Sequence, residues 1–192
     1  MAALQAVSAA VEALTPSTVG HSQRVADLAA RLAVEVGSLP TAEIAALHEA
    51  ALLHDVGKVA VPAEVLSRPG RLAPGELQQV RCHPWVGWVM VTSVLTPSQA
   101  QLVRHHHERW DGRGYPDAIR LRELSAAVSL LALADSFDAM VHRPHSGCLG
   151  LDQAIDECIR HSATQFAPAA VSALVRLADR GALPVGTTPP GR

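Results

Sequence analysis

The sequence predicts an all-α protein. Of its 192 residues, 48% are hydrophobic but only 3% are aromatic. The core must therefore consist mainly of Ala, Leu and Val, which suit closely packed helices better than strands. Apolar residues also repeat with helical spacing in successive segments, and prolines and glycines separate these segments. A chain of this length can bury a core without disulfides, as one domain with short extensions.

The first helical segments follow from their start and stop signals. Residues 2–14 have helical composition and end at the Thr-Pro-Ser sequence of residues 15–17. A second segment runs from about residue 18 to 36 and stops before a glycine. Thr41 is a suitable N-cap for a third helix, whose apolar positions repeat until Gly57. This third segment carries His54, Asp55 and Lys58 at its C-terminal end.

The remaining helices are bounded by prolines and glycines. They are expected over residues 62–66, 74–82, 84–94, 97–110, 125–141, 151–159 and 168–180. His83 precedes a proline, so it is expected at a kink or a helix start.

The segments between and after the helices complete the predicted organisation. Residues 111–122 are expected to form a loop, and residues 181–192, with three prolines and three glycines, a flexible tail. The expected organisation is a helical extension at 1–14, one domain at 15–180 and the tail.

Charge and cysteine content exclude several classes of protein. A formal net charge of −2 gives no reason to expect binding to a nucleic-acid polymer or a membrane surface. The three cysteines lack C-x-x-C spacing, so neither a disulfide framework nor a zinc ribbon is indicated. No run of 18 apolar residues occurs, and the first residues lack a basic segment, so neither a membrane span nor a signal peptide is predicted. A cytoplasmic location fits these observations.

Three consecutive histidines, His105, His106 and His107, lead directly into the glycine-rich, proline-closed stretch at residues 108–116. Neutral imidazole binds first-row transition metals well. Consecutive helical residues point roughly 100° apart, so two adjacent imidazoles can serve two neighbouring ions. The sequence therefore predicts a metal site with a shaped entrance. The alternatives are a surface cluster or the remnant of a tag.

Two carboxylates occur in otherwise apolar helical segments. Asp55 follows His54, and Asp135 lies among leucines and alanines. An unpaired buried charge is costly, and a metal ion would supply the missing counter-charge. Lys58 is expected near Asp55, where its ammonium could hold a hydroxide or neutralise a phosphate oxygen. The alternative for His54 alone is a core histidine with ordinary hydrogen bonds.

These residues fall into motifs that resemble the HD-GYP family. The resemblance covers about residues 19–174. The family's motifs are matched in order by residues 54–58 (HDVGK), 83–87 (HPWVG), 106–116 (HHERWDGRGYP), 135–140 (DSFDAM) and 165–168 (QFAP). The resemblance implies an HD-type helical bundle and an intracellular enzyme that hydrolyses cyclic di-GMP to the linear dinucleotide pGpG, and in some members to GMP.

The resemblance also implies a set of metal ligands. These are His21, His54, Asp55, His83, His106, His107 and Asp135. Asp55 would bridge two divalent transition metal ions, with iron or manganese favoured. Members with three metals carry a glutamate where this chain has Ser17, so two ions are expected. The implied reaction is metal-assisted phosphodiester hydrolysis, with Asp55 and Lys58 as its catalytic residues. Lys58 would orient the attacking hydroxide or the scissile phosphate.

Substrate contacts are assigned by the same resemblance to Arg143 and to the loop residues Arg113, Gly114, Tyr115 and Pro116. Several positions depart from the family pattern. Ser129 stands where an arginine is common, and the Arg143 element lies one residue closer to Asp135 and lacks the downstream tyrosine and basic residue. These departures keep two alternatives open. One is a weakly active regulatory module that contacts a protein partner, such as a cyclase domain, through the 113–116 loop. The other is an HD phosphohydrolase of another nucleotide. The sequence does not indicate an oligomeric state.

Overall fold

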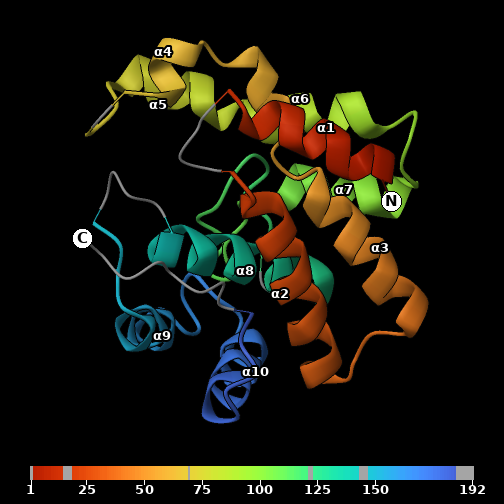
Figure 1. Ribbon diagram of the computed structural model, residues 1–192, viewed down its shortest axis with the longest axis vertical. Coiled ribbons are helices and arrows are strands. Elements are labelled where there is room, and N and C mark those ends of the chain that lie inside the picture. Colours follow the sequence, from red (N-terminus) through yellow and green to blue (C-terminus); the bar gives the residue numbers. More distant parts are fainter. Residues whose placement is uncertain (1, 15–18, 69, 121–122, 143–146, 185–192) are drawn as a thin grey trace.

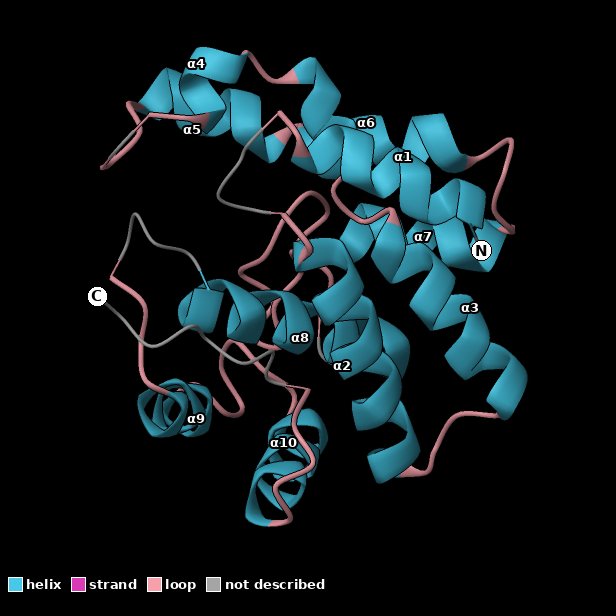
Figure 2. Ribbon diagram, viewed as in Figure 1, coloured by secondary structure: helices cyan, strands magenta, loops and turns pink. Residues whose placement is uncertain are grey.

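The computed structural model is all-α, as predicted, and no strand occurs in the part of the chain that it describes (Figure 2). The described residues are 2–14, 19–68, 70–120, 123–142 and 147–184. The helices are α1 (Ala2–Glu12), α2 (His21–Val36), α3 (Thr41–Leu52), the 3-10 helix η2 (Val56–Ala60), α4 (Ala63–Leu66), α5 (Pro74–Arg81), α6 (His83–Val91), α7 (Pro97–His105), α8 (Ala126–His142), α9 (Leu151–Arg160) and α10 (Pro168–Asp179). None of these helices is long and apolar enough to cross a bilayer.

Helix α2 lies at the centre of the bundle and packs against α3, α8 and α10 (Figure 1). The residues that α2 and α3 bury include alanines with no exposed surface, such as Ala29, Ala33, Ala50 and Ala51. Small side chains let two helix backbones approach closely. Leucines such as Leu32 and Leu131 fill the remaining space. The aliphatic core predicted from the composition is therefore confirmed.

A second layer is formed by η2, α6 and α7. Helix α6 packs against both η2 and α7, and α7 also contacts α3. Gly57 in η2 permits the closest of these approaches. A Cβ atom at this position would lie 2.0 Å from the carbonyl oxygen of His83 and 2.5 Å from the backbone nitrogen of Gly87. Because only a glycine fits, η2 can lie directly on the start of α6. This contact brings the residues around Asp55 next to His83.

Helix α1 packs against η2, α3 and α2, and Val11 joins the core. Its last residue, Glu12, is 8% exposed and accepts hydrogen bonds from the backbone N–H groups of Gly20, at 2.6 Å, and Ser22, at 2.7 Å. Gly20 is the N-cap residue of α2 and has no side chain to cap the helix. A carboxylate from another helix therefore satisfies N–H groups at this N-terminus, which carries His21.

The structure corrects two predicted helix ends. The third helix stops at Leu52 instead of continuing to Gly57, and the helix predicted over 97–110 stops at His105. His54 and Asp55, and likewise His106 and His107, lie in the turns that follow these helices. In both places the helix ends just before two adjacent residues whose side chains point to the same centre. Adjacent residues within a helix would point about 100° apart. His83 begins α6, as expected.

The predicted tail is only partly within the described residues. At its start, Leu183 is 8% exposed, and the carbonyl oxygen of Ala182 accepts a hydrogen bond from Arg31 at 3.0 Å. Residues 181–184 thus pack on the bundle. Residues 185–192 lie outside the described part of the chain.

Candidate metal centre

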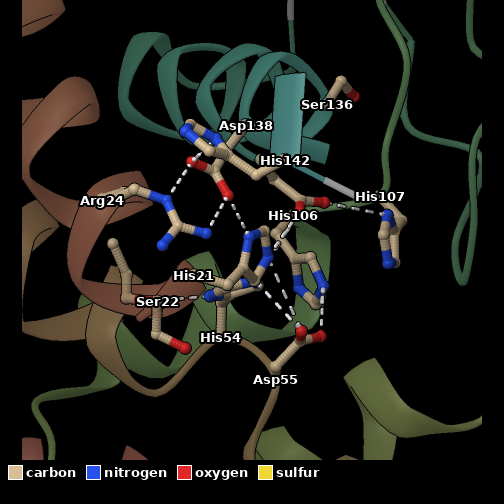
Figure 3. A network of polar contacts seen from close by, with 12 residues as sticks. His21, Ser22, Arg24, His54, Asp55, His106, His107, Ser136, Asp138 and His142 are labelled. Carbon is tan, nitrogen blue, oxygen red and sulfur yellow. Dashed lines mark hydrogen bonds and ion pairs between the residues drawn. The ribbon is translucent and has the colours of Figure 1, made fainter. Parts of the chain in front are cut away.

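Side chains from five regions of the chain converge between the two layers, and Figure 3 shows His21, His54, Asp55, His106 and His107 among them. Most of them lie at a helix end, where the backbone can turn inward, and each is buried or partly buried. They are His21 at the start of α2, His54 and Asp55 after α3, His83 at the start of α6, His106 and His107 after α7, and Asp135 within α8. The structure thus brings together every metal ligand that the sequence predicts.

Three imidazoles are oriented in the same way by the backbone. The Nδ1 atoms of His54, His83 and His106 each lie 2.7 Å from the carbonyl oxygen three residues earlier in the chain. A carbonyl oxygen only accepts hydrogen bonds, so each Nδ1 carries the proton. In the neutral ring the Nε2 atom then presents a lone pair to the centre, which is the tautomer that a metal ligand needs.

The Nε2 atoms at the centre lack ordinary partners. Those of His21 and His54 are buried without a hydrogen-bond partner among the described residues. The Nε2 atoms of His83 and His106 lie 3.1 Å apart, although the proton of each ring is on Nδ1. Two lone pairs at this distance repel each other unless a cation lies between or beside them. The residues present therefore fit a bound metal ion.

Asp55 divides the histidines into two groups. Its Oδ1 atom lies 3.2 Å from Nε2 of His83 and 4.0 Å from Nε2 of His106. Its Oδ2 atom lies 3.4 Å from Nε2 of His54 and 3.9 Å from Nε2 of His21. One carboxylate therefore faces two clusters of nitrogen ligands with different oxygens. A carboxylate in this position would be able to bridge two metal ions if both were bound.

Asp135 and His107 complete the two clusters. Asp135 Oδ1 lies 3.1 Å from Nε2 of His21 and 3.8 Å from Nε2 of His54. Its Oδ2 atom lies 3.8 Å from Nδ1 of His107, whose ligand atoms also group with those of His83 and His106. The first cluster thus comprises His21, His54 and Asp135, and the second comprises the other three histidines, with Asp55 between them.

The electrostatics of the centre favour ligand atoms that carry no proton. Burial alone would raise the pKa of Asp55, but the nearby Lys58 and the histidines hold it well below its usual range. Burial would also raise the pKa of Asp135, but the nearby His21 and His54 hold it well below its usual range. Burial and the neighbouring histidines lower the pKa of His106, and desolvation lowers that of His107 to about 3. Anionic carboxylates beside neutral imidazoles are the protonation states that bind metal.

His21 is held differently from the other histidines, through Asp138 of α8. Its Nδ1 atom lies 2.7 Å from Oδ2 of Asp138, which is 4% exposed. Arg24 donates to both oxygens of Asp138, at 2.7 and 3.0 Å, and His142 Nδ1 lies 2.9 Å from Oδ1 (Figure 3). Burial would lower the pKa of His21, but Asp135 and Asp138 raise it to about 9.

Asp138 is expected to control metal affinity at the His21 cluster. In the variant Asp138→Asn the carboxylate charge that orients His21 is lost, and the loss of such an outer partner typically costs about 10–100-fold in metal affinity. We expect Mn²⁺ titration to show this weakening for one of two ions, while the other binds as before. Asp156→Asn, at an exposed position of α9, is the matched control. Unchanged binding of both ions in Asp138→Asn would contradict this role.

Lys58 lies in η2, one turn beyond Asp55. Its Nζ atom donates a hydrogen bond to Oδ2 of Asp55 at 2.5 Å, and its side chain is 16% exposed. The ammonium therefore lies at the edge of the centre, beside the bridging carboxylate. Although η2 is a 3-10 helix and not the continuous α-helix predicted from the sequence, the expected contact of Lys58 with Asp55 is present.

The loop after α7 is held against the metal centre by its own backbone. Gly114 packs so closely that a Cβ atom would lie 2.5 Å from the backbone nitrogen of Arg109. Glu108, 2% exposed, accepts hydrogen bonds from the backbone N–H groups of Asp117, at 2.7 Å, and Ile119, at 3.1 Å. Both carboxylate oxygens of Glu108 thus hold the loop backbone in place. The Tyr115 ring stacks on His107, with centroids 4.8 Å apart.

A polar pocket of about 230 Å³ opens between this loop, α8 and the segment before α10. His106 and His107 form part of its wall, so it adjoins the metal centre. Arg113 and Tyr115, predicted as substrate contacts, line it. Gly114 packs against the loop backbone, and Pro116 is exposed. Arg143, the remaining predicted substrate contact, lies outside the described residues, as does Ser17.

Several residues at the site received no functional role from the sequence. Asp138 lies in an apolar helix, and its partner on α2 is 117 positions away in the sequence. Arg81 lines the pocket, and His142 faces Asp138. Gln165 binds Arg109 at 2.9 Å. No local sequence pattern predicts these contacts, because each depends on how segments far apart in the sequence pack together.

Comparisons with known proteins agree with this geometry. The family model described as "HD domain" matches residues 5–170. A protein of Thermotoga maritima named cyclic di-GMP phosphodiesterase is 35% identical over 161 residues, which cover 82% of this chain and 44% of that protein. The 3'3'-cGAMP-specific phosphodiesterase 3 of Vibrio cholerae is 33% identical over 147 residues, 76% of this chain and 32% of that protein. This chain therefore spans less than half of either relative.

The fold also matches a solved structure. The HDG"Y"P protein Bd1817 of Bdellovibrio bacteriovorus superposes with a TM-score of 0.69 at 20% sequence identity, covering 83% of this chain and 51% of the other. At this identity the likeness concerns the fold. It agrees with the HD-type helical bundle expected from the motifs.

Proposed function

The chain belongs to the HD domain family, in its HD-GYP branch, and from this premise we propose that it is a metal-dependent phosphodiesterase that hydrolyses a cyclic dinucleotide. Cyclic di-GMP is the proposed substrate, with pGpG and then GMP as products. The names of the relatives, which include phosphodiesterases of cyclic di-GMP and of 3'3'-cGAMP, support the substrate class.

The observation that carries the proposal is the position of Asp55. Its two oxygens face two separate clusters of imidazole nitrogens, at 3.2 Å on one side and 3.4 Å on the other. Two metal ions, iron or manganese, are proposed to be held by these clusters, since imidazole and carboxylate ligands suit both metals. When bound, such a pair acidifies a water molecule and neutralises charge that develops on the phosphate.

The protein's own groups would supply the remaining requirements of hydrolysis. Asp138 and the backbone carbonyls orient the imidazoles, so their positions need little reorganisation. Lys58 places a positive charge at Oδ2 of Asp55, where it can orient the attacking oxygen or the scissile phosphate. The pocket beside His107 gives the nucleotide a polar surface next to the reacting phosphate.

Metal analysis and product chromatography test the proposal together. Protein purified without oxygen should hold about two metal ions per chain and convert cyclic di-GMP to pGpG. Parallel reactions with 3'3'-cGAMP and with linear dinucleotides identify the preferred nucleotide. If the protein at full metal occupancy hydrolysed no cyclic dinucleotide, the proposed phosphodiesterase activity would be refuted and a regulatory module would be favoured. Three tightly bound ions would refute the argument from Ser17.

A further inference from the structure

The pocket beside the metal centre is too small for a whole cyclic dinucleotide. Its volume of about 230 Å³ is below the roughly 300–1,000 Å³ typical of pockets that enclose a drug-sized ligand. Its wall includes His106 and His107, so a ligand at the metal centre would extend directly into it. The pocket therefore suits one part of a larger ligand whose reacting group lies at the ions.

The charge of the pocket indicates which part of the ligand it would bind. Arg81, Arg109 and Arg113 line it, together with the carboxylate of Glu108. Asp111 adds a second carboxylate nearby, but both of its oxygens bind Arg109. Neither Arg81 nor Arg113 forms an ion pair with a carboxylate in the described ranges. When Asp111 is counted with its partner Arg109, three guanidinium groups and two carboxylates lie in or beside the pocket, which leaves a surplus of one positive charge among them.

Stacked side chains link Arg81 to the metal centre. Its guanidinium carbon lies 5.2 Å from the centroid of the Tyr115 ring, within the range of a cation–π contact. The Tyr115 ring in turn stacks on His107 at an interplanar angle of 29°. A guanidinium stacked in this way keeps its N–H groups available for a bidentate contact with an anion.

We propose that Arg81 and Arg113 form a subsite for the second, non-reacting phosphate of the cyclic dinucleotide, with Tyr115 between this subsite and the metal ligand His107. The proposal rests on the proposed function. A cyclic dinucleotide carries two phosphodiesters, of which one reacts at the ions. The other carries a single negative charge, which matches the single surplus charge of the pocket. A substrate with one phosphate gains nothing from this subsite.

The subsite is tested by the equilibrium binding of cyclic di-GMP, which is measured by calorimetry. The parent protein for this measurement is the metal-loaded Lys58→Ala variant, in which turnover is slow. Adding Arg81→Ala should weaken binding about tenfold or more, the effect of a lost charge-assisted hydrogen bond, and Arg81→Lys should recover part of it. The metal content of the Arg81→Ala protein should stay the same. Arg71→Ala removes an exposed arginine outside the pocket and should change nothing.

The outcomes separate the subsite from the proposed function. If Arg81→Ala and Arg113→Ala both bind cyclic di-GMP like their parent, or if the parent does not bind it, the subsite is refuted. If the parent binds it and loses affinity on Arg81→Ala, while protein with Lys58 intact hydrolyses no cyclic dinucleotide, the subsite stands and the enzymatic function fails.

Discussion

Asp55→Ala is expected to remove bound metal and phosphodiesterase activity together. The two oxygens of Asp55 face different histidine clusters, so both ions would lose a ligand. Loss of an outer partner alone typically costs about 10–100-fold in metal affinity, and loss of a shared ligand should exceed that range. Turnover should fall to that of the metal-free protein. Metal analysis after gel filtration and cyclic di-GMP hydrolysis give the two measurements.

The matched control for this variant is Asp156→Ala, at an exposed position on α9. It removes the same charge without touching the centre and should keep metal and activity. Circular dichroism should show that Asp55→Ala retains its helices, because the aliphatic core does not involve Asp55. An Asp55→Ala protein that still held two ions per chain would disprove the bridging role.

Lys58→Ala is expected to separate catalysis from metal binding. The ammonium contacts Asp55 but offers no ligand to an ion, so most metal should remain bound. Turnover should fall by roughly 10²–10⁴, the range for a lost proton-transfer or electrostatic group. Steady-state kinetics beside metal analysis measure both effects.

Lys58→Arg keeps the positive charge on a differently shaped group and serves as the conservative comparison. It should recover part of the lost turnover. Full activity in Lys58→Ala would show that the assigned role is wrong. Loss of metal in Lys58→Ala would instead mean that the ammonium mainly supports the charge of Asp55.

The sequence predicts the fold class well, and it identifies histidines and carboxylates that the structure brings together, because both depend on local signals. Alternating apolar segments, prolines and glycines mark the helices, and ordered motifs mark the histidines and carboxylates. The predicted ends of the third and seventh helices were less accurate, since the tight approach of Gly57 to His83 is a tertiary constraint. Propensity alone favours continuation of such a helix.

Contacts between distant segments could not be predicted in the same way. The pairs Asp138 with His21 and Glu12 with the start of α2 join helices whose relative placement no short pattern encodes. Arg81 illustrates the same limit: in the sequence it is an arginine at a helix end, and only the packing of α5 on the loop after α7 gives it an aromatic neighbour.

Lys58 is the only lysine in the sequence, whereas most protein surfaces carry many lysines. Amine-selective reagents therefore have one side-chain target, and this target lies against the bridging carboxylate. Reductive methylation with ¹³C-formaldehyde would place a single labelled side chain at the centre, beside the signal of the terminal amine. Its NMR resonance would report directly on the occupancy of the site, and paramagnetic iron or manganese would broaden that one signal.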